Sequence, residues 1–588
     1  MREWLQETHG VKFELTRHFL ARMFDSELFA ARGQWQTVAI SLIAFILPAF
    51  MLFGEYGKKY GHLAHLASPL PFRSAEVADI LSLFTLLMAI SGLVALMQWQ
   101  SLFPSKRDFL ALAGLPVRSR QIFAARFTAV LIFVAAVVLL ISFPLTLVIP
   151  PQMMGRWAKN PSLLASIAAF GVASCLACWF VFLGAMALQG ALLHLLPRKL
   201  FSRVSVYVQG IGMAVFFLAS LFSWTIGDWQ PEMIARLPQF GQWLPPVWFA
   251  GLHEAMLGDG DVFFQAMKSR AWLAVATAAA ITVVTYLLGF SRYRKLLVET
   301  HDDAHTRHRS QLSLLRLLAP DPRGEAVLQF MARVLARSRT HRVVLLAYIG
   351  VALGLVFNSI LLTHSLLYLK RWWYEAIQFI VLFWPLMLTA VILPGFRHAA
   401  AMPAELSANW IFQSTESLGR AQWMKAVERF VIVCLIGPIY LVLTPFSFSV
   451  LGWQLALRMT TLQLLVSLTM FEMMFNNWQQ LPFTCSYRPG KRPVMAIFAR
   501  VLGLLGVAVP LLALTIRAAS SFWQTWIIYG ALFAGIWIWT RRRRLDGWGE
   551  NKLLYIDAET VPGLGIGDLT YRPQELATIA PILERRSS

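Results

Sequence analysis

Charged residues and cysteines are both scarce in this chain. Only 14% of its 588 residues are charged and 57% are hydrophobic, whereas about 25% charged residues is usual in a soluble protein. This composition excludes an ordinary soluble protein and is typical of a membrane protein. Four cysteines are present, and the closely spaced pair, Cys175 and Cys178, lies within an apolar run. We interpret the cysteines as packing residues and expect no disulfide, redox or metal site.

Acidic residues are fewer than basic ones, and the net charge of +21 could indicate a nucleic-acid partner. The positions of the charges argue otherwise. With a cytoplasmic N-terminus, most of the 52 Lys and Arg residues fall in segments predicted to face the cytoplasm, as the positive-inside rule requires. We therefore expect no nucleic-acid partner. The basic block Arg541–Arg544 (Arg541, Arg542, Arg543 and Arg544) directly follows the last apolar run and fits a membrane anchor on anionic lipid.

The motifs of an energy-coupling or hydrolytic enzyme are missing. Gly57-Lys58 and Gly490-Lys491 lack both the upstream glycine spacing and the following Ser or Thr of a P-loop. No HExxH or GxSxG sequence occurs. We therefore expect that this chain is not an enzyme and needs no cofactor, and that any ATPase activity belongs to a partner subunit.

Long apolar runs dominate the chain, and each is long enough to cross the ~30 Å hydrocarbon core as a helix. The predicted spans are 37–53, 79–101, 127–149, 163–190, 207–226, 270–290, 343–362, 375–394, 428–450, 453–474, 499–516 and 522–540. The predicted fold class is all-α: a polytopic membrane protein with about twelve transmembrane helices as two six-helix repeats, with cytoplasmic termini. Arg126-Phe127 and Arg429-Phe430 precede the third span of each half, which supports a parallel repeat.

The polar segments divide the chain into five parts. We expect residues 1–36 to form a cytoplasmic amphipathic N-terminal helix and 541–588 a cytoplasmic tail. Between them lie a first six-span core at 37–290, a basic cytoplasmic linker at 291–342 and a second six-span core at 343–540.

Two of the polar segments have recognisable patterns. Leu15, Phe19 and Met23 recur at helical spacing, which indicates a helix lying on the inner membrane face, with a poorly ordered tail as the alternative. No cleavage site follows the first apolar run, so we expect no signal peptide. In the long outer loop 227–269, residues 244–252 contain Pro-Pro and Trp and predict a short interfacial helix begun by proline.

Titratable groups are scarce inside the predicted spans. Asp79, Glu375 and Glu428 fall at span ends, and Glu472 lies near the inner end of the tenth span. Ion-coupled transporters carry such groups within the membrane, so this distribution disfavours coupling to protons or sodium. The linker has an acidic and histidine-rich stretch, but its spacing fits no established metal site and a solvated loop is favoured. These residues are His301, Asp302, Asp303, His305 and His308.

The loop between the second and third spans is the most informative segment. It predicts a short amphipathic helix from Lys106 to Ala113, a Gly-Leu-Pro break, and a basic turn leading into the third span. A rigid element of this kind can be pushed by a cytoplasmic partner. The alternative is an ordinary loop whose arginines follow the positive-inside rule.

This loop resembles the coupling loop of type-two ABC exporter permeases, in which Asp, then Leu-Pro-Val, then a basic turn link the second and third spans. The resemblance implies that a separate ATPase docks on the loop, in a bacterial cytoplasmic membrane. It also implies an interfacial connecting helix at the N-terminus and an outer re-entrant element near 244–252. In the second half, residues 403–430 occupy the same place without Asp and Leu-Pro at matching positions. The implied coupling residues are Lys106, Arg107, Asp108, Leu115, Pro116, Arg118, Arg120, Asn409 and Arg420.

A single twelve-span chain would then supply both permease cores of one exporter, with two ATPase copies bound. Two alternatives stay open. One is an ion-coupled secondary transporter, and the other is a membrane scaffold or a transferase acting on lipid-linked substrates. The transferase would need convergent polar groups, and loop 227–269 offers candidates in no recognisable spacing. These are Asp228, Glu232, Arg236, His253, Glu254 and Asp259.

Overall fold

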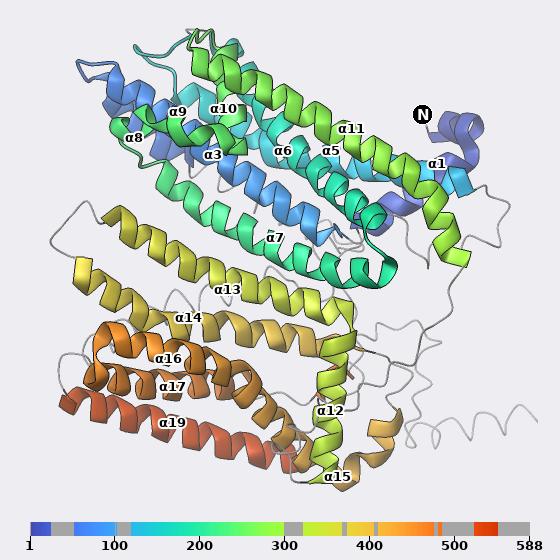
Figure 1. Cartoon of the computed structure of the whole chain (residues 1–588), viewed down its shortest axis with the longest axis vertical. Coiled ribbons are helices and arrows are strands. Elements are labelled where there is room, and N and C mark those ends of the chain that lie inside the picture. The colour runs from blue at the N-terminus through green and yellow to red at the C-terminus, as the bar shows by residue number, and fades with distance from the viewer. Residues whose placement is uncertain are drawn as a thin grey trace, which may run out of the picture.

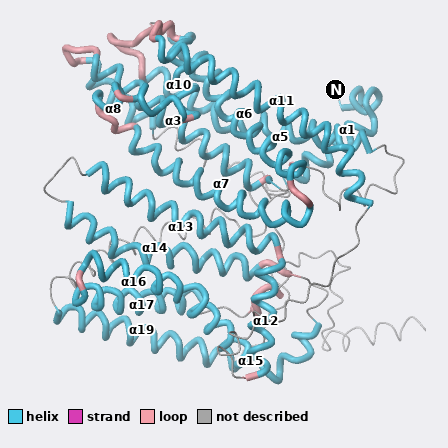
Figure 2. Tube along the Cα trace, viewed as in Figure 1, coloured by secondary structure: helices cyan, strands magenta, loops and turns pink. Residues whose placement is uncertain are grey.

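A computed structural model describes most of the chain. The described residues are 2–24, 52–99, 102, 119–160, 162–298, 321–366, 373–404, 410–475, 480–484 and 523–550. Within these ranges the chain is helical and has no β-strand (Figures 1 and 2). Seven described helices are long and apolar enough to cross a membrane. The prediction of an all-α, multi-pass membrane protein is therefore confirmed.

The first half contains residues 52–64, which are helical, and a series of labelled helices. These are α1 (Arg2–Phe24), α3 (Leu70–Met97), α5 (Ser119–Gln152), α6 (Leu163–Leu195), α7 (Arg198–Ile226), α8 (Pro231–Ala235), α9 (Leu237–Phe240), the 3-10 turn Gly241–Trp243, α10 (Pro245–Met256) and α11 (Val262–Val298).

The second half is also a series of helices. Its elements are α12 (Pro322–Arg337), α13 (Arg339–Leu366), α14 (Trp373–Ala401), α15 (Trp410–Phe430), the π-helix Val431–Ile436, α16 (Gly437–Leu451), α17 (Trp453–Phe475) and α19 (Trp523–Glu550). The π-helix ends two residues before Pro438, whose ring removes a backbone donor and disturbs the regular ladder of hydrogen bonds.

The membrane-crossing candidates account for seven of the predicted spans. They are α3, α5, α6, α7, α11, α13 and the continuous helix formed by the end of α15, the π-helix and α16. Predicted spans 375–394, 453–474 and 522–540 are helical, as α14, α17 and α19, but are not among the seven. Nearly all of 37–53 and the whole of 499–516 lie outside the described residues. The number twelve therefore stays a prediction.

Several helix boundaries differ from the predicted boundaries of spans and segments. Helix α3 begins at Leu70 rather than at 79, with prolines in its first turn. The predicted linker 291–342 begins inside α11 and contains α12. Charged residues lower the mean hydropathy of α12, although the helix has a buried apolar stripe. The stripe is formed by Val327, Leu328, Met331 and Val334. Helix α19 also continues to Glu550, past the predicted start of the tail at 541.

Each half packs around its own apolar core. The main described contact between the halves is formed by α7 and α13, which lie side by side near the middle of the molecule (Figure 1). Small residues allow this close approach. A Cβ at Gly350 would lie 2.9 Å from the Cβ of Ala214, and one at Gly210 would lie 2.9 Å from the Cβ of Leu346.

The same helix pairs recur in the two halves. Helix α1 packs on α5, and α12 packs on α15. Helix α6 contacts α3, α5 and α11, while α17 makes the corresponding contacts with α14, α16 and α19. We call the end of the bundle that carries α1 and α12 the inner end, and the opposite end, which carries α8, α9 and α10, the outer end (Figure 1).

The N-terminal segment is helical, as α1, and packs on α5. Its apolar side chains Leu15 and Phe19 are buried against Ile122 and Ala125 of α5. Val11, on the preceding turn, remains 48% exposed. Part of the apolar face of α1 therefore packs on α5, and its position at the inner membrane face stays a prediction.

Candidate functional site

Most of the predicted ATPase-coupling residues lie outside the described residues. This holds for Lys106, Arg107, Asp108, Leu115, Pro116, Arg118 and Asn409, and for linker residues 301–308. Arg120 lies in the first turn of α5 and Arg420 lies in α15. The structure thus places the backbone of these two arginines near the inner end of their halves.

The helix turns that follow Arg120 hold the N-terminal helix. The guanidinium of Arg126 lies 5.1 Å from the ring centroid of Phe19 in α1, a cation–π arrangement. Phe19 is fully buried and Arg126 is only 4% exposed. In this way α1 is fixed to the helix that directly follows the predicted coupling loop.

The second half has a corresponding arrangement on α15. Phe330 of α12 packs on Phe412 with ring centroids 5.0 Å apart, and Phe412 packs on Trp423 at 5.9 Å. The segment 480–484, which contains Leu481 and Pro482, also docks here. Its Phe483 exchanges backbone hydrogen bonds with Ala400 and Ala404, at 2.7 and 2.8 Å.

The predicted membrane anchor lies in α19 and is partly engaged within the protein. Arg541 donates to Glu428 of α15 at 2.8 Å, and Glu428 is almost fully buried. Arg542 and Arg543 are exposed, and the Arg543 guanidinium lies 5.8 Å from the Trp539 ring. Arg542 and Arg543 therefore remain available to lipid headgroups, whereas Arg541 joins α19 to α15.

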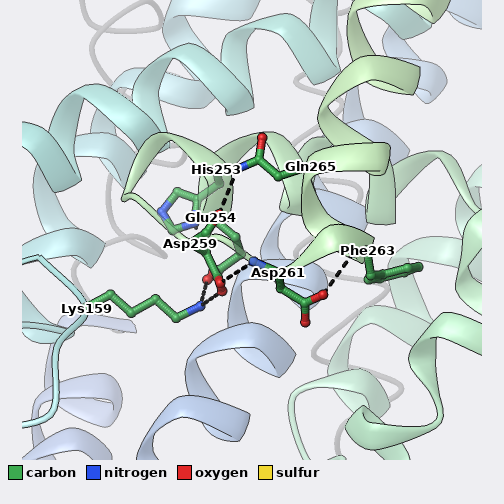
Figure 3. Close-up of polar contacts among 7 residues, drawn as sticks. All are labelled: Lys159, His253, Glu254, Asp259, Asp261, Phe263 and Gln265. Atoms are coloured by element: carbon green, nitrogen blue, oxygen red, sulfur yellow. Dashed lines mark hydrogen bonds and ion pairs between the residues drawn. The ribbon is translucent and has the colours of Figure 1, made fainter.

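A second polar cluster lies at the outer end and includes polar residues of loop 227–269, for which the sequence showed no recognisable spacing. Lys159, in the loop between α5 and α6, forms an ion pair with Glu254 of α10 and another with Asp259, at 2.5 Å (Figure 3). Glu254 is fully buried. We call these two contacts the Lys159 latch, because they join the α5–α6 loop to the segment between α10 and α11.

Local structure holds the acidic side of the latch in place. Pro245 and Pro246 begin α10, as the sequence predicted, and its buried face packs against α3, α6 and α11. The helix ends before Gly258, whose φ of +92° favours glycine. Asp259 then accepts a hydrogen bond from the backbone N–H of Asp261 at 3.0 Å.

The electrostatics of the latch favour its charged form. Burial alone would raise the pKa of Glu254, but hydrogen bonding from His253 and the charge of Lys159 lower it below the usual range. Burial likewise opposes the charge on Lys159, yet Glu254 and Asp259 raise the pKa of its ammonium. For Asp259 the pKa is also lowered, because its hydrogen bonds from Lys159 and Asp261 outweigh burial.

A further carboxyl group beside the latch has one buried oxygen that no described residue contacts by a hydrogen bond. Glu76 of α3 is 4% exposed, and its Oε2 atom is buried and makes no hydrogen bond in the described part of the chain. Glu76 lines a small cavity of about 10 Å³ together with His253, Lys159 and Asn160. This volume is about the minimum that holds one water molecule.

The next acid along α3, Asp79, is fully paired. It accepts from Lys59 at 2.8 Å and from the Tyr60 hydroxyl at 2.7 Å. Burial, together with the charge of Asp79, raises the pKa of Tyr60, which therefore remains a neutral donor. Both acids lie close together on α3. Each carboxylate oxygen of Asp79 accepts a hydrogen bond, whereas Oε2 of Glu76 accepts none from the described residues.

Of the polar residues predicted in loop 227–269, the structure brings His253, Glu254 and Asp259 together. Asp228 lies instead on the side of Asp79, and Glu232 and Arg236 are exposed. Sequence reasoning did not single out Lys159 or Glu76. No group of three or more His, Cys, Asp or Glu side chains is arranged to hold a metal ion among the residues that the structure describes.

No protein-family model, curated protein or solved structure matches this chain.

Proposed function

We propose that this chain is the membrane-spanning permease subunit of an ATP-driven exporter in a bacterial cytoplasmic membrane. In this proposal it consists of two fused six-helix cores, and a separate ATPase energises it by docking at the inner end. The observation that carries the proposal is the paired docking of α1 on α5 and of α12 on α15. An amphipathic helix thus braces the same helix of each half, next to the predicted coupling segments.

The mechanism follows from this bracing. Force applied by an ATPase to the loop before α5 would act on a helix that is fixed to α1 by buried contacts of Phe19 and Arg126. The loop and its core would therefore move as one body. Because the described halves meet mainly through α7 and α13, their relative rotation would be the motion of alternating access.

Charge reversal in the predicted coupling loop tests the proposal. The full-length chain is tagged, purified from native membranes, and analysed for bound P-loop ATPase and for ATP hydrolysis. Asp108→Lys and Arg120→Glu are expected to reduce both by about tenfold, since repulsion at a docking surface costs more than 1 kcal/mol. The matched control is Arg236→Glu, a charge reversal at an exposed outer-end position. Capture and hydrolysis that survive both loop variants would show that the coupling assignment is wrong.

An ion-coupled secondary transporter is the second candidate, and buried Glu76 favours it. An acid within a candidate membrane span is by default a functional group, and the earlier start of α3 places Glu76 inside one. Proteoliposomes containing the chain alone, under an imposed pH gradient, distinguish the candidates. Uptake or release of an apolar dye driven by the gradient without ATPase would favour this second function over the first.

A further inference from the structure

Among the described residues of the outer end, a buried carboxyl oxygen of Glu76 has no hydrogen-bond partner. Lys159 contacts both Glu254 and Asp259, and His253 Nδ1 lies 3.2 Å from the second oxygen of Glu254. Each of these acids therefore has a cationic or donor partner. Glu76 Oε2 has none among the described residues, although Glu76 is 96% buried (4% exposed). An ionised carboxylate buried in this way is strongly disfavoured unless a cation or proton neutralises it.

The charges that face Glu76 do not supply this neutralisation. Glu254 and Asp259 repel a negative charge on Glu76, whereas Lys159 and Arg73 attract one. Lys159 is already bound to two carboxylates, and Arg73 is exposed on the surface of α3. The cavity residues from α5 and α6, Pro150, Ser166 and Phe170, carry no charge. A third carboxylate would thus add negative charge to a cluster with a single buried ammonium.

The cavity shows where the neutralising species would sit and what encloses it. It is lined by Ala158, Lys159 and Asn160 of the α5–α6 loop and has room for about one water. The same loop carries the basic half of the latch. The loop that Lys159 joins to Glu254 and Asp259 therefore controls the access of water to Glu76 from the outer side.

We propose that Glu76 binds one proton at the outer end of the first core, and that this proton keeps the Lys159 latch closed. When Glu76 is neutral, Lys159 stays with Glu254 and Asp259. When the proton leaves to water, the new carboxylate repels Glu254 and competes for Lys159, so the α5–α6 loop is released. This proposal does not depend on an ATPase. It and the proposed exporter function can therefore fail separately.

The direction of the pH dependence follows from linkage. The closed state holds the proton more tightly than the open state, so raising the pH favours opening. Each pKa unit of difference between the two states shifts the opening equilibrium tenfold. Opening is therefore expected at alkaline pH and closure at acidic pH.

Accessibility of the loop provides the test. Ala158→Cys is introduced into the full chain, which is reconstituted in lipid nanodiscs and treated with a maleimide. The modified peptide is quantified by mass spectrometry, so the native cysteines do not interfere. Gln230→Cys, at an exposed outer-end position, corrects for the pH dependence of thiol reactivity. The normalised rate at position 158 is expected to rise by about tenfold between about pH 6 and about pH 9.

Two variants decide the interpretation. Glu76→Gln keeps the shape of a protonated glutamate, so labelling should stay slow at every pH. Lys159→Gln breaks the latch, so labelling should be fast at every pH. Misfolding would make labelling faster in both variants. It therefore cannot explain slow labelling in Glu76→Gln together with fast labelling in Lys159→Gln. A rate at position 158 that does not change with pH, or a rise that persists in Glu76→Gln, would overturn the proposal.

Discussion

Arg339, the first residue of α13 in the second half, donates a hydrogen bond from Nη2 to the hydroxyl of Ser205 in α7 of the first half, at 2.8 Å. The indole N–H of Trp99, just beyond the end of α3, donates to the same hydroxyl at 2.8 Å. Trp99 is fully buried and comes shortly before the predicted coupling loop. One hydroxyl group therefore joins the end of α3 to the second half of the chain.

Ser205→Ala should weaken this junction. The substitution removes the acceptor for two donors, and each donor left without a partner costs about 1–3 kcal/mol. We expect a lower apparent melting temperature of the detergent-solubilised chain. Ser220→Ala is the matched control, since the hydroxyl of Ser220 donates only to Phe217 within α7. Equal melting temperatures for the two variants would contradict a role for Ser205 in joining the halves.

Lys159→Met should destabilise the outer end strongly. The substitution leaves Glu254, which is fully buried, without its ammonium partner, and breaking a buried pair in this way typically costs about 3–5 kcal/mol. Lys59→Met is the comparison, because the side chain of Lys59 is 36% exposed in its pair with Asp79. Thermal unfolding should show the larger loss for Lys159→Met. A loss no greater than that of Lys59→Met would show that the latch contributes little.

The latch should also make stability depend on pH at the acidic end. The folded-state pKa values of Glu254 and Asp259 are lowered, so their contribution is present above the unfolded values of about 4 and disappears as pH falls through the folded values. The apparent melting temperature should therefore drop below about pH 4. The drop should be smaller in Lys159→Met, which no longer favours the carboxylates. An equal drop in both proteins would place the acid-labile groups elsewhere.

At the inner end, Phe19→Ala should release α1 from α5. Phe19 is fully buried, and truncating such a residue typically costs about 3–5 kcal/mol. Hydrogen–deuterium exchange of residues 11–24 should then become faster while α7 and α13 keep their protection. Val11→Ala, at a position that is 48% exposed, should leave exchange unchanged. If both variants exchange alike, α1 is held by something other than the Phe19 contact.

The sequence was sufficient for features that depend on local pattern. Long apolar runs predicted the membrane class, and Pro245 and Pro246 predicted the start of α10. Helix α12 was missed because charged residues interrupt its apolar stripe, so hydropathy alone gave a linker. The start of α3 was predicted too late. Hydropathy falls where polar residues begin, whereas the helix continues through those residues to Leu70.

The outer cluster was not predictable for a different reason. Lys159 and Glu254 are 95 positions apart in the chain and meet only after α5, α6 and α10 have packed. Nothing in their local sequences distinguishes them from other loop charges. Similarly, Arg541 and Glu428, which pair and so join α19 to α15, are 113 positions apart. Long-range pairing of this kind depends on tertiary structure.

The stoichiometry of the native complex tests the central claim most directly. The full-length chain, purified gently from its own membranes, is analysed by native mass spectrometry with and without ATP. We expect one copy of this 66.3 kDa chain together with two copies of a P-loop ATPase, as two fused permease cores require. A chain that is isolated alone or as a homodimer without an ATPase, and that still transports in proteoliposomes, would contradict the account.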